Sequence, residues 1–178
     1  MSVSFEQLEK HLTKYNNEIK LVKINVQDLE FSTSNALKCF YCEKYNTCWM
    51  CPPRIPALDY QAIFSEYKNS AILYSRFEFD KDNYNSVRVE SSVTIHKAVL
   101  NLESFLLQNN SSTYLSFIGG SCKLCKNGCG IEKCNNRYNA RVSMEAVGIN
   151  VVETLSKFGI EVSFPVKNDM IRVGMILW

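Results

Sequence analysis

Hydrophobic residues recur along four segments of the chain with the spacing of helices that bury one face. The segments are FEQLEKHLTKY at 5–15, ALDYQAIFSEYK at 57–68, a long one from Asn85 to Gln108, and one from Ser143 to Phe158. Ser143 is placed to cap the last helix and Gly159 to end it. Gly148, inside that helix, would allow a neighbouring element to pack closely.

Residues that favour strands are concentrated between these helices. Strands are predicted for IKLVKINV at 19–26, SAILYSRFEF at 70–79 and TYLSFIGG at 113–120, where the third strand runs into a glycine turn. The segment 160–178 is predicted to form a C-terminal hairpin around Asn168 and Asp169, residue types that are common in turns.

Strands that alternate with helices and end in a hairpin predict an α/β or α+β fold, with a mixed sheet and flanking helices. Composition does not shift along the chain, so we expect residues 1–178 to form a single domain. Two cysteine-rich loops lie outside the predicted elements. The second loop lies between a strand end and a helix start, where α/β sheets usually hold their sites.

The composition indicates a folded chain without a strong bias toward one class of partner. Hydrophobic residues make up 46% of its 178 residues, and the formal net charge is +2. So small a charge favours neither a nucleic-acid nor a membrane partner. The chain has no signal-peptide pattern and no apolar run of membrane-spanning length, so we expect a cytoplasmic protein. Structural disulfides are rare in that compartment.

All eight cysteines fall into two compact groups. The first group has the spacing C-x2-C-x5-C-x2-C, and the second has C-x2-C-x3-C-x4-C. They comprise Cys39, Cys42, Cys48 and Cys51, followed by Cys122, Cys125, Cys129 and Cys134. Chance would not gather every cysteine of the chain in this way, so both groups are predicted to bind metal.

The spacing favours iron–sulfur clusters over single zinc ions. A zinc site with four cysteines usually takes two C-x2-C pairs about fifteen residues apart or more. No gap within either group exceeds five residues. Short cysteine runs ligate [4Fe–4S] clusters in bacterial ferredoxins, and a proline like the one after Cys51 ends those runs. We therefore predict two [4Fe–4S] sites, with zinc binding and redox thiol chemistry as alternatives.

Two segments, YCEKYNTCWMCPP and GGSCKLCKNGC…RVSMEAVGINV, together resemble a family of uncharacterised prokaryotic proteins described as predicted metal-binding proteins. In that family a C-x2-C pair and a C-P-P segment precede a G-G-x-C-x2-C loop and the sequence S-M-E-A-x-G-I. The resemblance covers both cysteine loops and the segment after the second. It implies iron–sulfur binding, and it implies no particular reaction.

The chain departs from the family pattern in both loops. The pattern needs only three cysteines in the first loop, and Cys48 is additional to them. The second loop lacks the longer spacer and the later proline that accompany the last family cysteine, which makes Cys129 and Cys134 less typical than the pair before them. A cluster held by three cysteines leaves one iron open, whereas four cysteines leave none. The role of Cys48 therefore separates electron transfer from substrate chemistry at the first site.

The long helix carries two apolar stripes with a polar pair between them. The stripes are Val89, Val93, Leu100 and Leu107, and Ile95, Val99, Leu102 and Leu106. His96 and Glu103 lie between these stripes on the inward arc, where polar groups need partners. They are interpreted either as a core hydrogen-bonded pair or as outer residues that support a cluster, with His96 as a further candidate ligand.

Charged and aromatic residues surround the cysteines. The basic residues near the second group are Lys123, Lys126, Lys133, Arg137 and Arg141. They either tune the potential of an anionic cluster or bind an acidic partner, or they form a solvated loop surface. Tyr41, Tyr45 and Trp49 are expected to shield the first group from water.

Three functions are consistent with these patterns. The first is an iron–sulfur protein that transfers electrons or serves a redox enzyme as an accessory, which requires a redox partner protein. The second is an enzyme that uses an open cluster iron on a small molecule. The third is a zinc-stabilised interaction module. No residue is predicted to be catalytic, and neither a nucleic acid nor a membrane is an expected partner.

Overall fold

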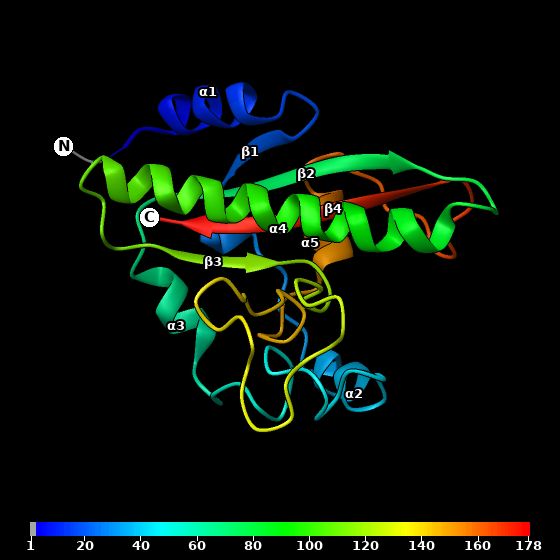
Figure 1. The fold of residues 1–178 in the computed structure, drawn as a ribbon. Coiled ribbons are helices and arrows are strands. Elements are labelled where there is room, and N and C mark those ends of the chain that lie inside the picture. Colours follow the sequence, from blue (N-terminus) through cyan, green and yellow to red (C-terminus); the bar gives the residue numbers. More distant parts are fainter. Residues whose placement is uncertain (1–2) are drawn as a thin grey trace.

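Four strands form the sheet on which the rest of the molecule is arranged (Figure 1). The structure is a computed structural model and describes residues 3–178. The strands are β1 (Lys20–Ile24), β2 (Ser70–Glu78), β3 (Leu115–Ile118) and β4 (Asp169–Leu177), in the order β1-β2-β4-β3. The expected α/β or α+β class is confirmed. The sheet, however, is antiparallel between all neighbouring strands rather than mixed.

The position of β4 explains the antiparallel sheet. β2 and β3 both pair antiparallel with β4, so they run in the same direction as each other. The long helix α4 (Tyr84–Gln108) connects them, as in a β-α-β crossover whose strands are split apart. Because β4 enters between them in the opposite direction, the two parallel strands are not neighbours.

Helices cover both faces of this sheet (Figure 1). On one face α1 (Phe5–Tyr15) and α4 pack over a core that includes Leu73 of β2 and Ile176 of β4. On the other face α3 (Tyr60–Ser65) and α5 (Val151–Ser156) contribute Phe64 and Leu155 to a second apolar cluster.

One of the two predicted stripes of α4 forms the core contact. Ile95, Val99, Leu102 and Leu106 are buried. The other stripe lies toward solvent, and its Val89 and Leu107 are exposed. Gly174 of β4 allows α4 to approach the sheet, because a Cβ at this position would lie 2.6 Å from Cγ2 of Val99.

The helix predicted for residues 143–158 begins later, at Val151. Gly148 has a φ of +94°, a left-handed conformation that interrupts a helix, so its role differs from the predicted close packing. Ser143 still accepts a hydrogen bond from the N–H of Ala146, but it caps only a turn. Asn150 caps α5 instead, and Gly159, with a φ of +70°, follows its end as predicted.

The predicted C-terminal hairpin does not form. Only Asp169–Leu177 joins the sheet, and residues 160–168 contain no strand. Pro165 lies in this segment and has no N–H to donate to a strand ladder. Two short elements were not predicted, a 3₁₀ turn η1 (Val26–Asp28) and a helix α2 (Ser34–Phe40) directly before the first cysteine loop.

Candidate metal centre

The first cysteine loop starts inside a helix. Cys39 lies in the last turn of α2, so the prediction that both cysteine groups lie outside regular elements is wrong at this residue. Asn35, buried in the same helix, donates hydrogen bonds to the carbonyls of Gly148 and Ile149. These bonds hold α2 against the segment that leads into α5. Consecutive turns then carry the chain from Cys39 to Arg54.

The second cysteine loop leaves the sheet through the Gly119–Gly120 pair. The N–H of Gly119 donates to the carbonyl of Val173 in β4 at 2.7 Å, where a Cβ on Gly119 would meet the Val173 side chain at 2.6 Å. Gly120 has a φ of +72°, and its N–H donates to the Glu145 carboxylate at 3.0 Å. Glycine is therefore needed for the chain to turn away from β3 immediately before Cys122.

Two buried side chains of α4 hold the other end of the second loop. Nε2 of His96 donates to the carbonyl of Asn139 at 2.8 Å, because a carbonyl can only accept. Glu103 accepts from Nε of Arg141 at 2.6 Å and from the Ser116 hydroxyl. The contacts found in residues 3–178 thus join His96 and Glu103 to the segment after Cys134 instead of to each other. Their role in supporting a bound metal stays a prediction.

Cysteines from both loops line one small cavity. The cavity has a volume of about 40 Å³, and Cys48 of the first loop, which is 3% exposed, forms part of its wall. The other thiols in the wall are Cys122, Cys125, Cys129 and Cys134. The four cysteines of the second group therefore border one cavity, together with one thiol from the first loop.

The other three cysteines of the first loop line a separate and larger cavity. Its volume is about 440 Å³, and its wall contains Cys39, Cys42 and Cys51 together with Glu145. Cys48 is not part of that wall as far as the described residues show. By the cavities they line, the eight thiols fall into a group of five and a group of three, which touch where Cys48 and Cys51 are hydrogen-bonded.

The aromatic residues of the first loop lie differently from the prediction. Tyr41 is 81% exposed and shields nothing. Tyr45 lines the larger cavity, whereas Trp49 lines the smaller one. Nε1 of Trp49 donates to the carbonyl of Gly130 at 2.7 Å, so this residue also connects the two loops.

The family model described as "Predicted metal-binding protein (DUF2284)" matches residues 22–178. The chain belongs to this family. The match includes both cysteine loops and both cavities, which confirms the prediction of a metal-binding family. No curated protein and no solved structure gives a significant match.

The donor atoms of this DUF2284 member suit a soft metal. All eight cysteines are free thiols, and thiolates select zinc, copper(I) and iron–sulfur clusters. In the part of the chain that the structure describes, no three Cys, His, Asp or Glu side chains converge closely enough to hold one metal ion. Among the helices of the same part, none has the length and apolar character needed to cross a bilayer.

Thiols must lose their protons before they can bind metal, and individual cysteines of this chain differ in this respect. A hydrogen bond from Cys51 lowers the pKa of Cys48 to about 5. The same bond, followed by burial, raises the pKa of Cys51. Burial, with a smaller contribution from the nearby thiols Cys48 and Cys125, raises the pKa of Cys122 to about 11. In this DUF2284 member Cys48 therefore loses its proton more easily than Cys51 or Cys122.

Glu145 is a candidate site residue whose importance the sequence did not reveal. It does not lie at a helix N-terminus, because α5 begins only at Val151. Burial raises the pKa of the Glu145 carboxyl, and the Gly120 N–H opposes that shift. The pKa of Cys39 is raised by burial first and by the Glu145 charge next. The S-M-E-A sequence of the family pattern was the available signal.

The basic residues around the second loop do not form one continuous surface. Three of its residues are exposed, as expected for a solvated loop: Lys126, Lys133 and Arg137. Arg141 is paired with Glu103. Lys123 lines a further cavity beside β4.

Proposed function

We propose that this protein binds two iron–sulfur clusters of the [4Fe–4S] type, one at each thiol group. Membership of a predicted metal-binding family and the presence of eight free thiols in two groups support this proposal. The cysteines follow one another at the short spacings that favour clusters. A cytoplasmic location, where thiols stay reduced, suits this function.

The observation that carries the functional assignment is the position of Cys48. It lines the cavity of the second group, whereas the cysteines that line the larger cavity, among the described residues, are Cys39, Cys42 and Cys51. The five-thiol group has enough cysteines to occupy every cluster corner, which suits electron transfer with a redox partner protein. The three-thiol group leaves one corner without a cysteine. A cluster held there supplies an open iron for a small molecule.

The surrounding residues support such a division of roles. Trp49 and Met50 cover one side of the small cavity. Four of its thiols also line a neighbouring cavity of about 1170 Å³, so a cluster there is accessible to a redox partner: Cys48, Cys122, Cys125 and Cys129. The larger cavity is bordered by the polar side chains of Ser143, Glu145 and Asn150, which can orient a bound molecule. We therefore favour a redox protein that acts on a small molecule. Electron transfer to a separate redox enzyme is the simpler form of the same proposal.

Anaerobic purification followed by iron, zinc and acid-labile sulfide analysis tests this proposal. We expect a brown protein with iron and sulfide in equal amounts, and an EPR signal after reduction. Cys39→Ser should remove the iron of the three-thiol site, and Cys125→Ser should remove the iron of the five-thiol site. Colourless protein that holds stoichiometric zinc and no sulfide would refute the iron–sulfur proposal in favour of a zinc module.

A further inference from the structure

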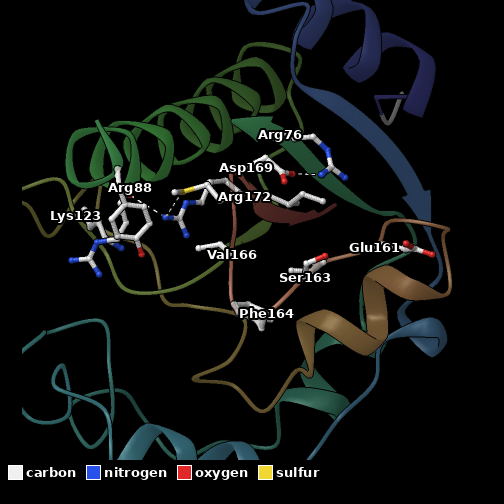
Figure 2. Close-up of a pocket in the computed structure, with 13 residues that line it drawn as sticks. Arg76, Arg88, Lys123, Glu161, Ser163, Phe164, Val166, Asp169 and Arg172 are labelled. Atoms are coloured by element: carbon white, nitrogen blue, oxygen red, sulfur yellow. Dashed lines mark hydrogen bonds and ion pairs between the residues drawn. The ribbon is translucent and has the colours of Figure 1, made fainter. Parts of the chain in front are cut away.

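A basic cavity lies between the start of α4, the start of β4 and residues 161–166. Its volume is about 240 Å³. Figure 2 shows Arg88, Lys123 and Arg172 toward one end of it, while Arg76 lies at the other end beside Asp169. Arg76 and Asp169 form an ion pair. The charge of Arg76 is therefore balanced within the cavity.

The basic side chains at the other end of the cavity form no such ion pair in the described part of the chain. Within residues 3–178, none of Arg88, Lys123 and Arg172 forms an ion pair with a carboxylate. Burial lowers the pKa of Arg172 and the charge of Arg88 lowers it further, while Tyr84 and the charge of Glu145 oppose this shift only in part. Gathering like charges in a half-buried position is unfavourable unless an anion offsets them.

The guanidinium of Arg172 is held in a fixed orientation. Its Nε donates to the Ser91 hydroxyl at 3.0 Å, and its Nη2 donates to the Arg88 carbonyl and the Met170 sulfur, each at 3.1 Å. Among the contacts of the described residues, Nη1 has no acceptor. An arginine with one edge fixed and another available can bind a carboxylate or phosphate with little loss of side-chain entropy.

The basic cavity adjoins the cavity of the three thiols. Arg88 and Phe164 line both of them. Phe164 is 73% exposed, which is unusual for a large apolar side chain and places its ring where a ligand could cover it. A small molecule can therefore have its charged group in the basic cavity and its remaining atoms beside Cys39, Cys42 and Cys51.

We propose that Arg88, Lys123 and Arg172 form an anion-binding site for the phosphate or carboxylate of a small acidic substrate. The site itself depends only on these side chains, whereas its role in holding a substrate of the thiol cavity rests on the function proposed above. Arg172 and Lys123 contact the charged group, and Arg88 closes the site at its exposed edge.

Isothermal titration calorimetry on the anaerobically purified full-length protein tests the site with two probes, inorganic phosphate and malonate, at constant ionic strength. We expect saturable binding of one probe. Arg172→Gln and Arg88→Gln should each weaken it about tenfold or more, the effect of losing one charge-assisted hydrogen bond. Arg172→Lys should restore part of the affinity, and Lys81→Gln, which removes an exposed charge outside the cavity, should leave it unchanged.

The outcomes separate the two ligand chemistries and the two proposals. Phosphate binding with this variant pattern assigns a phosphate-bearing substrate, and malonate binding with the same pattern assigns a carboxylate. Binding of neither probe, or an equal loss in Lys81→Gln, would overturn the anion site. Because Arg88 is exposed, its variant remains informative if Arg172→Gln unfolds the protein. Iron and sulfide are measured on the same samples, so metal-free protein that still binds the probe would reject the cluster proposal alone.

Discussion

The indole Nε1–H of Trp49 and the carbonyl of Gly130 are joined by a hydrogen bond of 2.7 Å, which links the two cysteine loops across 81 positions of the sequence. Arg54 lies over the same indole, 4.3 Å from its centre. The loops are thus connected by a protein contact as well as by the thiols that they share around one cavity.

Replacement of Trp49 by phenylalanine tests this connection. An aromatic ring is kept, but the N–H donor and part of the indole are lost, so unfolding should become easier by about 1 kcal/mol or more. A chelator should also remove metal faster from the variant than from the wild type. Denaturant unfolding and the rate of metal loss are the two measurements. Tyr41→Phe, a change at an exposed ring, serves as the control, and equal behaviour of the two variants would contradict the prediction.

Serine variants of Cys48 and Cys39 test the division of thiols into five and three. Cys48→Ser should leave the spectroscopic signal of the three-thiol site unchanged, because Cys48 lines the other cavity. Cys39→Ser should abolish that signal and preserve the other one. EPR spectra and iron content of the reduced variants give the answer. Loss of the three-thiol signal in Cys48→Ser would mean that the first loop acts as one four-cysteine unit.

The buried pair of Glu103 and Arg141 makes the end of the second loop sensitive to mutation. Arg141→Met should destabilise the protein by about 3–5 kcal/mol, because it leaves the carboxylate of Glu103 buried without its partner. The double variant Glu103→Leu with Arg141→Met should recover much of that loss. Denaturant unfolding of the two single variants and the double variant measures the coupling. Additive effects would show that the pair is not coupled.

His96 should make stability fall in mild acid. Burial lowers its pKa below the ordinary value, so the unfolded chain binds a proton more readily than the folded one. Stability from this residue is therefore fully present at pH values above the unfolded pKa near 6.5, and it declines as the pH falls toward the lower folded pKa.

Denaturant unfolding between pH 7.5 and 5, a range of about two units around that pKa, measures the effect. His96→Gln should lower stability at pH 7.5 and reduce the acid-dependent decline. His11→Gln removes the other histidine and should retain the decline seen in the wild type. A decline of equal size in His96→Gln would assign the acid sensitivity to other groups.

Local patterns predicted the regular elements well where one signal dominated. The Asn85–Gln108 prediction agrees with α4 within one residue, because a long run of apolar residues at helical spacing predicts the helix, although only one of its two stripes is buried. The hairpin prediction was wrong because Pro165 cannot complete a ladder. The helix from Ser143 was wrong because the left-handed backbone at Gly148 breaks it. The spacing of hydrophobic residues reveals neither the effect of the proline on strand pairing nor the left-handed backbone at the glycine.

The cysteine groups were predictable, but their final partition was not. Spacing shows which thiols are neighbours along the chain, so Cys48 was assigned to the first group. In the folded protein Cys48 instead lines a cavity with Cys122 and Cys129, and contacts such as the hydrogen bond between Trp49 and Gly130 hold the two loops together there. Arg172 was also missed, because its approach to Arg88 depends on how β4 packs against α4.

The central position of β4 has a consequence for the order of events during synthesis. β2 and β3 pair with β4 and not with each other in the described structure, so the sheet stays open until residues 169–177 have left the ribosome. The second cysteine loop is tied to this strand through Gly119 and Val173. Nascent chains that already expose all eight thiols thus lack the strand that anchors them. Metal delivery is expected only after residues 169–177 have emerged and β4 has paired.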